Sequence, residues 1–257
     1  MQRNAIALVL VALAVLPVCA SDVEVWSADR RIESPVELHG KGLRIESGVR
    51  VTFVGEGSLL VQDAAVECRR VTFEAEGTLT NRFRISVLKG RANFQDCEFR
   101  AIRSFTPAGA KIHWVEGGIC INQGSGSHFS HCTFSACSPV MVMSSHGCEI
   151  DGNLCVGGER GFSLLQCRNA RISANEFWGV TDIAIKASHI KDSELFMNRF
   201  TRCATGVRLS WCSDTRLSGN AFFDCVTGFS FCECGTGIVE NGNRFENVKS
   251  SKKEKVK

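Results

Sequence analysis

Residues 198–212 read NRFTRCATGVRLSWC, and residues 220–234 read NAFFDCVTGFSFCEC. At an offset of 22 residues, six of the fifteen positions are identical. Self-similarity at a fixed period of this length indicates a repeat architecture, in which each copy forms one unit that packs on the next. The identical pairs are Asn198/Asn220, Phe200/Phe222, Cys203/Cys225, Thr205/Thr227, Gly206/Gly228 and Cys212/Cys234.

The Asn-x-Phe signature at the start of both stretches recurs along the C-terminal half of the chain, in steps of 22 or 23 residues. Upstream, cysteine takes the place of asparagine in 97–99 and 132–134, and 71–73 is a degenerate copy. The step of 35 between Phe99 and Phe134 implies an inserted loop at about 106–118. The asparagines form a structural ladder of Asn153, Asn175, Asn198, Asn220 and Asn243.

Each copy contains short alternating apolar runs broken by Gly, Asn, Ser or Asp, a pattern typical of strands and turns rather than helices. A coil of about 22 residues accommodates three short strands, and such coils stack at the strand spacing of about 4.8 Å. We expect the asparagine at a turn, where it tolerates left-handed backbone and can hydrogen-bond the next asparagine. The sequence therefore predicts an all-β fold, a single-stranded right-handed parallel β-helix of about nine coils.

The repeat resembles the right-handed parallel β-helix repeat family, the pectin-lyase-like superfamily. The resemblance rests on the pattern I/L-x-x-N-x-F across about 148–248 and, more loosely, on the chain from about 43. It implies the fold but little about function, because one fold hosts many activities. Register offers a check: stacking places Glu176 beside Arg199 and Arg202 beside Asp224, and adjacent strands favour such opposite charges.

The N-terminus predicts export. A basic start and the apolar run 5–18 precede Val18-Cys19-Ala20, which favours a secretory signal peptide at 1–20 with cleavage after Ala20. A lipoprotein processed at Cys19 is an alternative, disfavoured by the bulk of Val18. We expect an N-terminal cap at 21–42, the β-helix at 43–248 and a basic disordered tail at 249–257. The expected product is a secreted, periplasmic or cell-envelope monomer without a transmembrane segment. Its formal net charge of +3 gives no argument for nucleic acid.

The cysteines fall into columns, and thirteen of the fourteen follow the predicted signal peptide. Stacked strands bring equivalent Cα atoms to about 4.8 Å, within disulfide range. Two interpretations stay open. The favoured one is a reduced ladder of small buried side chains, and the other is rung-to-rung disulfides, Cys203–Cys225 and Cys212–Cys234.

Potential metal ligands lie close together in one region of the sequence. They are of the types that zinc prefers: His128, His131, Cys132, Cys137, His146 and Cys148. Cys132 and Cys137 occupy positions that other coils of the repeat fill with structural residues. Residues three apart on a strand, such as His128 and His131, face opposite sides. We therefore expect neither a metal site there nor a cofactor. Calcium is not excluded, although Asp182 and Glu159 alone are too few for a calcium cage.

Two outward columns form the candidate site. One contains Ser163, Lys186, Arg208 and Ser230, and the other contains Gln166, His189, Trp211 and Glu233. Neighbouring like charges are unfavourable unless an anion bridges them, and arginine binds carboxylates through two hydrogen bonds. With Trp211 as a flat apolar surface, Lys186 and Arg208 point to an acidic polysaccharide as the partner.

The resemblance adds an enzymatic alternative. A polysaccharide lyase of this superfamily eliminates across a uronate ring, which would make Lys186 the base, Arg208 the carboxylate clamp or acid, and His189 a proton donor. Our leading hypothesis is a carbohydrate-binding module, and the lyase is its first rival. The second rival is a non-catalytic structural or surface-interaction protein in which these charges only solubilise an exposed sheet.

Overall fold

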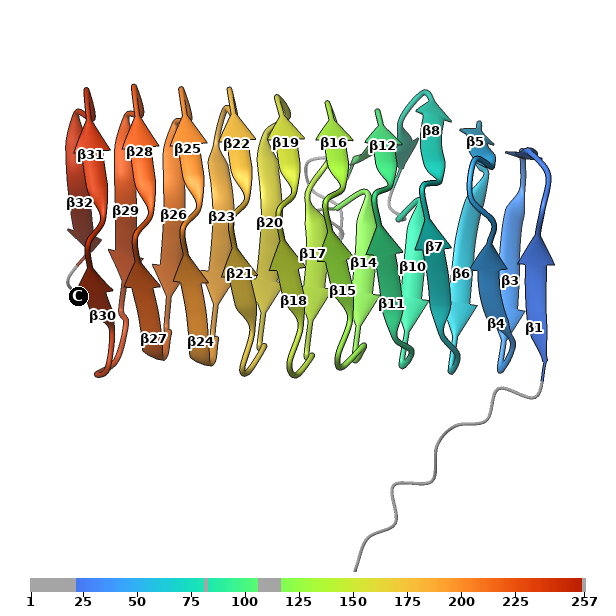
Figure 1. Cartoon of the computed structure of the whole chain (residues 1–257), viewed down its shortest axis with the longest axis horizontal. Helices are drawn as coiled ribbons and strands as arrows, with labels where there is room; N and C mark the ends of the chain where they lie inside the picture. Colours follow the sequence, from blue (N-terminus) through green and yellow to red (C-terminus); the bar gives the residue numbers. More distant parts are fainter. Residues whose placement is uncertain (1–21, 81–82, 106–116, 256–257) are drawn as a thin grey trace, which may run out of the picture.

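The computed structural model describes residues 22–80, 83–105 and 117–255. Its strands wind around one long axis, and successive coils follow each other along that axis in sequence order (Figure 1). Three parallel sheets run the length of the molecule, each with ten strands in the described part of the chain. The fold is therefore a right-handed parallel β-helix, of ten coils where the sequence predicts about nine.

Each coil contributes one strand to each sheet. Sheet A contains β1 (Val23–Trp26), β4 (Gly42–Ile45), β7 (Val66–Arg69), β11 (Ala92–Gln95), β15 (His128–Ser130), β18 (Glu149–Asp151), β21 (Arg171–Ser173), β24 (Lys191–Phe196), β27 (Ser213–Ser218) and β30 (Val239–Asn241). Sheet B contains β2 (Arg30–Ile32), β5 (Arg50–Val54), β8 (Thr72–Glu76), β12 (Glu98–Arg100), β16 (Thr133–Ser135), β19 (Leu154–Val156), β22 (Glu176–Trp178), β25 (Arg199–Thr201), β28 (Ala221–Phe223) and β31 (Arg244–Glu246). Sheet C contains β3 (Pro35–His39), β6 (Ser58–Gln62), β10 (Ile85–Leu88), β14 (Ile119–Asn122), β17 (Val140–Met143), β20 (Arg160–Leu165), β23 (Ile183–Ser188), β26 (Thr205–Ser210), β29 (Thr227–Cys232) and β32 (Ser250–Lys255). A small extra sheet pairs β9 (Leu79–Thr80) with β13 (Ser104–Phe105).

Both ends of the β-helix differ from the prediction. Strands β1, β2 and β3 pair with β4, β5 and β6, so the stretch expected as a cap forms a first coil. At the other end, β32 pairs in parallel with β29, so most of the expected disordered tail is a strand. The reason is that the edge of each sheet leaves backbone N–H and C=O groups that need partners, and an adjacent extended segment supplies them. The predicted signal peptide and residues 106–116 of the inserted loop lie outside the described residues.

The asparagines of the repeat are hydrogen-bonded from coil to coil, and all are buried except Asn243 in the last coil, which is half-buried. Asn175 Nδ2 donates to the Ile150 carbonyl and to Asn198 Oδ1, both at 2.9 Å. The same pattern runs from Asn153 to Asn243. The left-handed backbone expected for the asparagine belongs instead to the residue before it, with φ of 52° at Ala174. Ala174 reverses the direction of the chain, so the side-chain amide of Asn175 can point into the turn.

Phenylalanine rings fill the interior beneath sheet B. The rings of Phe200 and Phe222 stack with centroids 4.7 Å apart and planes within 7°. The repeated glycines make this possible, because a Cβ on Gly206 would lie 2.3 Å from the Phe222 ring and one on Gly228 would lie 2.5 Å from Phe245. The repeated residues therefore build the interior, and a function must be sought among the outward positions, which vary.

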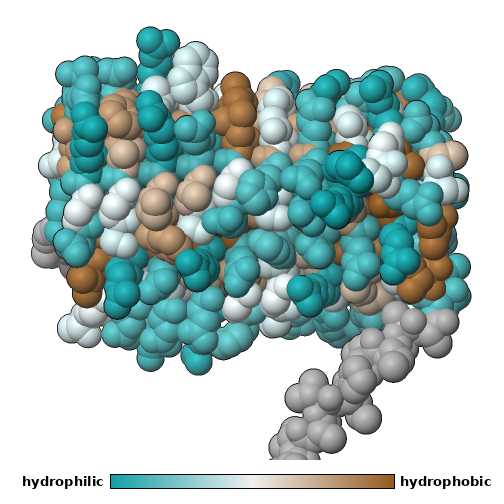
Figure 2. All heavy atoms as spheres, in the orientation of Figure 1, coloured by the Kyte–Doolittle hydropathy of each residue, from teal (hydrophilic) through white to brown (hydrophobic). Residues whose placement is uncertain are grey.

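Sheets A and B, which lie in front of sheet C in Figure 1, form the face seen in Figure 2. That face is mostly hydrophilic, with isolated apolar patches (Figure 2). Glu176 and Arg199 pair in register on sheet B, as the sequence predicts. Within the described residues, no helix is long and apolar enough to cross a membrane.

Candidate ligand-binding surfaces

The outward face of sheet C brings the predicted cations together. Lys186 on β23 pairs in register with Arg208 on β26, and Ser163 and Ser230 flank them on β20 and β29. Arg208 is exposed and Lys186 is half-buried. Both cationic side chains thus rise from neighbouring coils on one side of the sheet.

The second predicted column lies at the turn that follows these strands. His189 and Trp211 have left-handed backbone, with φ of 54° and 52°, and this bend keeps their side chains outward. Their rings stack at 5.1 Å, and the indole is 50% exposed. The Trp211 Nε1–H donates to Glu233 Oε2 at 2.9 Å. The arrangement presents an aromatic platform whose orientation is held by two neighbouring side chains.

The acidic residues near this face do not form a calcium cage. Asp182 Oδ2 accepts a hydrogen bond from Arg160 Nε at 2.8 Å, which commits that carboxylate to an ion pair. Across the described ranges, no group of three or more His, Cys, Asp or Glu converges as metal ligands. Oxygen-rich coordination therefore has no support from the charged residues of this surface.

The histidines and cysteines of the region 128–148 also separate. Cys132 and Cys137 point inward, where their thiols donate to the carbonyls of Phe94 and Phe99 at 3.4 Å. The histidines remain at the surface, where Asn169 Nδ2 lies 3.2 Å from His146 Nε2. Turn geometry is the cause, because each of these cysteines directly follows a residue with left-handed backbone, His131 (φ 52°) or Ala136 (φ 51°), and lies buried after the bend.

All thirteen cysteines of the described chain are free thiols in this structure. Cys212 and Cys234 hydrogen-bond each other through their sulfurs, directly below the turn that carries Trp211 and Glu233. The hydrogen bond from Cys212 lowers the pKa of Cys234 to about 6. Cys203 and Cys225 form a similar pair.

A cluster that the sequence analysis missed lies further along sheet C. Cys120 on β14 pairs in register with Met141 on β17, and Met143 lies two residues on from Met141, on the same outward side. Cys120 and Met141 are buried although they face away from the interior. Burial raises the pKa of Cys120 to about 12. Aligning the strand 140–143 with 119–122 could have found this cluster, had methionine been counted among the metal donors.

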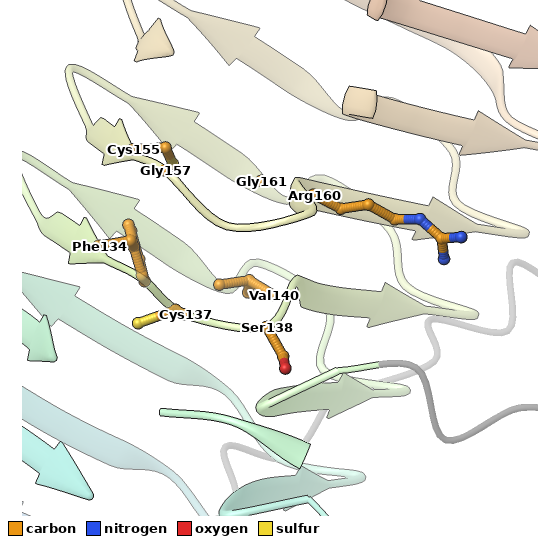
Figure 3. A pocket seen from close by; sticks show the side chains of 8 residues that line it. All are labelled: Phe134, Cys137, Ser138, Val140, Cys155, Gly157, Arg160 and Gly161. Atoms are coloured by element: carbon orange, nitrogen blue, oxygen red, sulfur yellow. The ribbon is translucent and has the colours of Figure 1, made fainter. Parts of the chain in front are cut away.

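A small interior cavity lies where the phenylalanine stack is interrupted (Figure 3). Cys155 stands where the two adjacent coils have Phe134 and Phe177, and Phe162 from sheet C packs edge-on against both rings across the gap. The remaining volume is about 10 Å³, enough for about one water molecule. The cavity is a packing defect of the repeat and has no room for a sugar.

Comparison with known proteins decides the family. The family described as periplasmic copper-binding protein (NosD) matches residues 89–257. This chain belongs to the NosD family. No curated protein matches it.

Solved structures resemble the chain only in its coiled architecture. The Streptococcus pneumoniae surface protein and adhesin PfbA is 7% identical, with a TM-score of 0.48 and 91% of each chain covered. The A-module of the Azotobacter vinelandii mannuronan C-5 epimerase AlgE4 is 10% identical, with a TM-score of 0.33, covering 91% of this chain and 90% of that one. Similarity at this level carries no argument about function.

The NosD family description raises the question whether the described residues suit copper. Copper(I) prefers soft thiolate and thioether sulfur. The outward donors Cys120, Met141 and Met143 are of that kind, and strand pairing places them on adjoining coils. The donor set on sheet C therefore fits copper(I), whereas the scattered histidines do not.

Proposed function

We propose that this NosD-family protein binds acidic polysaccharide in the cell envelope, through the C-terminal half of sheet C. The observation that carries the proposal is the register pair of Lys186 and Arg208 beside the half-exposed indole of Trp211. An arginine can hold a uronate carboxylate through two hydrogen bonds. An indole ring offers an apolar surface on which a sugar ring can pack.

Location in the periplasm or at the cell surface is part of the proposal. The NosD family is described as periplasmic, and the sequence predicts a signal peptide at 1–20. Envelope polysaccharides would then be within reach of the exposed face.

The test is binding to alginate and pectate at low and high salt. We expect the affinity to fall with salt, because exposed charges are screened. Lys186→Ala/Arg208→Ala should lower the affinity about tenfold or more, since hydrogen bonds to charged groups contribute about 1.5–3 kcal/mol and 1.4 kcal/mol corresponds to a factor of 10. Trp211→Ala should weaken binding as well.

Matched variants separate this site from general charge attraction. Arg44→Ala/Arg216→Ala removes the same charge from exposed positions on sheet A, and Trp178→Ala removes an equally exposed indole from sheet B. Both should bind like the unmodified protein. Equal weakening in these controls, or no binding by any form, would overturn the proposed site and favour a structural protein without a glycan ligand.

The lyase hypothesis uses the same residues and is a second outcome of the experiment. A base at Lys186 would remove the C5 proton, the C4–O bond would break with formation of a C4–C5 double bond, and His189 would protonate the departing oxygen. The positions of Lys186 and Arg208 on adjoining strands favour this candidate. A rise in the ultraviolet absorbance of the unsaturated product would identify catalysis, and binding without such a rise would limit the protein to recognition.

A further inference from the structure

The middle of sheet C carries sulfur donors on its outward side. Cys120 lies opposite Met141, and Asn122 lies opposite Met143, in the pairing of β14 with β17. The alternate residues of both strands belong to the interior core: Ile119, Ile121, Val140 and Val142. Alternation along a strand then sends Cys120, Met141 and Met143 to the same outer face.

These donors are shielded although they face outward. Cys120 is 3% exposed and Met141 is 6% exposed. Met143 and Asn122 are half-buried, so the cluster reaches solvent on the side that these two residues form. The cluster thus combines a desolvated interior with a route by which a small ion could enter.

An unpaired polar atom adjoins the cluster. Ser163 on β20 follows Met141 in the same outward column and is 5% exposed. Its Oγ has no hydrogen-bond partner within the part of the chain that the structure describes. Burying a hydroxyl without a hydrogen-bond partner has an energetic cost. A ligand beside Met141 that contacts this oxygen would offset that cost.

We propose that Cys120, Met141 and Met143 bind one copper(I) ion, with Ser163 Oγ at its edge. One thiolate and two thioethers form a soft donor set, which selects copper(I) over calcium, magnesium or manganese. Cys120 and Met141 lie opposite each other on adjacent strands, at the strand spacing of about 4.8 Å, so one ion between them can contact both sulfurs. Methionine is unbranched and flexible, so its sulfur can adjust to the ion.

The first test measures copper(I) affinity under anaerobic, reducing conditions, by competition with a chromophoric copper(I) chelator. We expect one tightly held equivalent. Cys120→Ser should weaken it by more than about a hundredfold, since even an outer-shell partner is worth about 10- to 100-fold. Cys232→Ser is the control, because Cys232 also faces outward on sheet C but lies away from the methionines. An unchanged affinity in Cys120→Ser would overturn the proposal.

The second test identifies the methionines directly. Silver(I), a redox-silent analogue of copper(I), is added to protein carrying ¹³C-methyl methionine, and the methyl resonances are assigned with Met141→Leu and Met143→Leu. These substitutions conserve volume, so the fold should tolerate them. The first equivalent of silver(I) should shift the methyl signals of Met141 and Met143. Met197, which is 67% exposed at a different turn, should not shift. Bound silver(I) that leaves Met141 and Met143 unshifted would overturn the site.

Discussion

Two stretches of the outer face of sheet C carry opposite chemistry on the same scaffold. The C-terminal stretch carries the exposed Arg208 and the half-buried Lys186, whereas the middle stretch buries the sulfur donors Cys120 and Met141. Beneath both stretches, the inward residues are aliphatic or aromatic and pack into one core. A β-helix therefore keeps its inside constant and varies its outside coil by coil, so neighbouring segments can bind different ligands.

The largest effect is expected in the interior core, which supports both stretches. Phe200 is fully buried and stacked between Phe177 and Phe222, so Phe200→Ala should lower the free energy of unfolding by about 3–5 kcal/mol. Urea denaturation followed by circular dichroism measures this loss. Phe223→Ala, at a half-buried outward position, is the control and should cost much less. A similar loss in both variants would contradict the constant-interior model.

A crossed experiment tests whether the two stretches act independently. Cys120→Ser should abolish tight copper(I) binding and leave alginate affinity unchanged, and Lys186→Ala/Arg208→Ala should do the reverse. Cys120 and Lys186 are three coils apart, about 14 Å at the strand spacing. Substitutions more than about 10 Å apart without shared partners couple by only about 0.3–0.5 kcal/mol. A loss of both activities in either variant would show that the stretches are coupled.

The thiols below the C-terminal stretch should differ in reactivity. The pKa of Cys234 is lowered to about 6 by the hydrogen bond from Cys212, whereas burial raises the pKa of Cys167, in the same turn column, to about 11. Because the thiolate is the nucleophile, iodoacetamide should modify Cys234 at a rate that rises with pH and levels off above about 6. Mass spectrometry of peptides across a pH series gives the midpoint.

Cys212→Ala removes the hydrogen-bond donor and should move the Cys234 midpoint upward. A protein in which neither Cys212 nor Cys234 reacts until a reductant is added would instead indicate the disulfide between them, the interpretation that the sequence analysis leaves open.

The smallest effect concerns the residue that orients the indole. Glu233 accepts the Trp211 hydrogen bond and places a negative charge beside the proposed uronate site. Glu233→Gln keeps an acceptor oxygen and removes the charge, so alginate should bind about two- to fivefold more tightly, consistent with about 0.2–1 kcal/mol for an exposed charge pair. Isothermal titration at low salt measures the change. Weaker binding would mean that the carboxylate itself contacts the sugar.

The repeat alone determined the coil, its period and much of its register. Asn198 and Asn220 recur because each amide bonds the next, and Gly206 and Gly228 recur because a phenylalanine ring occupies the space of a Cβ. Such contacts lie between equivalent residues of adjacent coils, so the sequence spacing reports them directly. The placement of Lys186 beside Arg208 could be predicted for the same reason.

Burial on the outer face was decided only by the tertiary structure. Nothing in the spacing says that Cys120 and Met141 are shielded, or that the Ser163 hydroxyl has no hydrogen-bond partner among the residues that the structure describes. The expected cap and most of the expected tail likewise became strands, because backbone pairing with the adjacent coil outweighs local side-chain composition. Sequence periodicity records what each coil shares with its neighbour, and exposure depends on what the whole chain places above that coil.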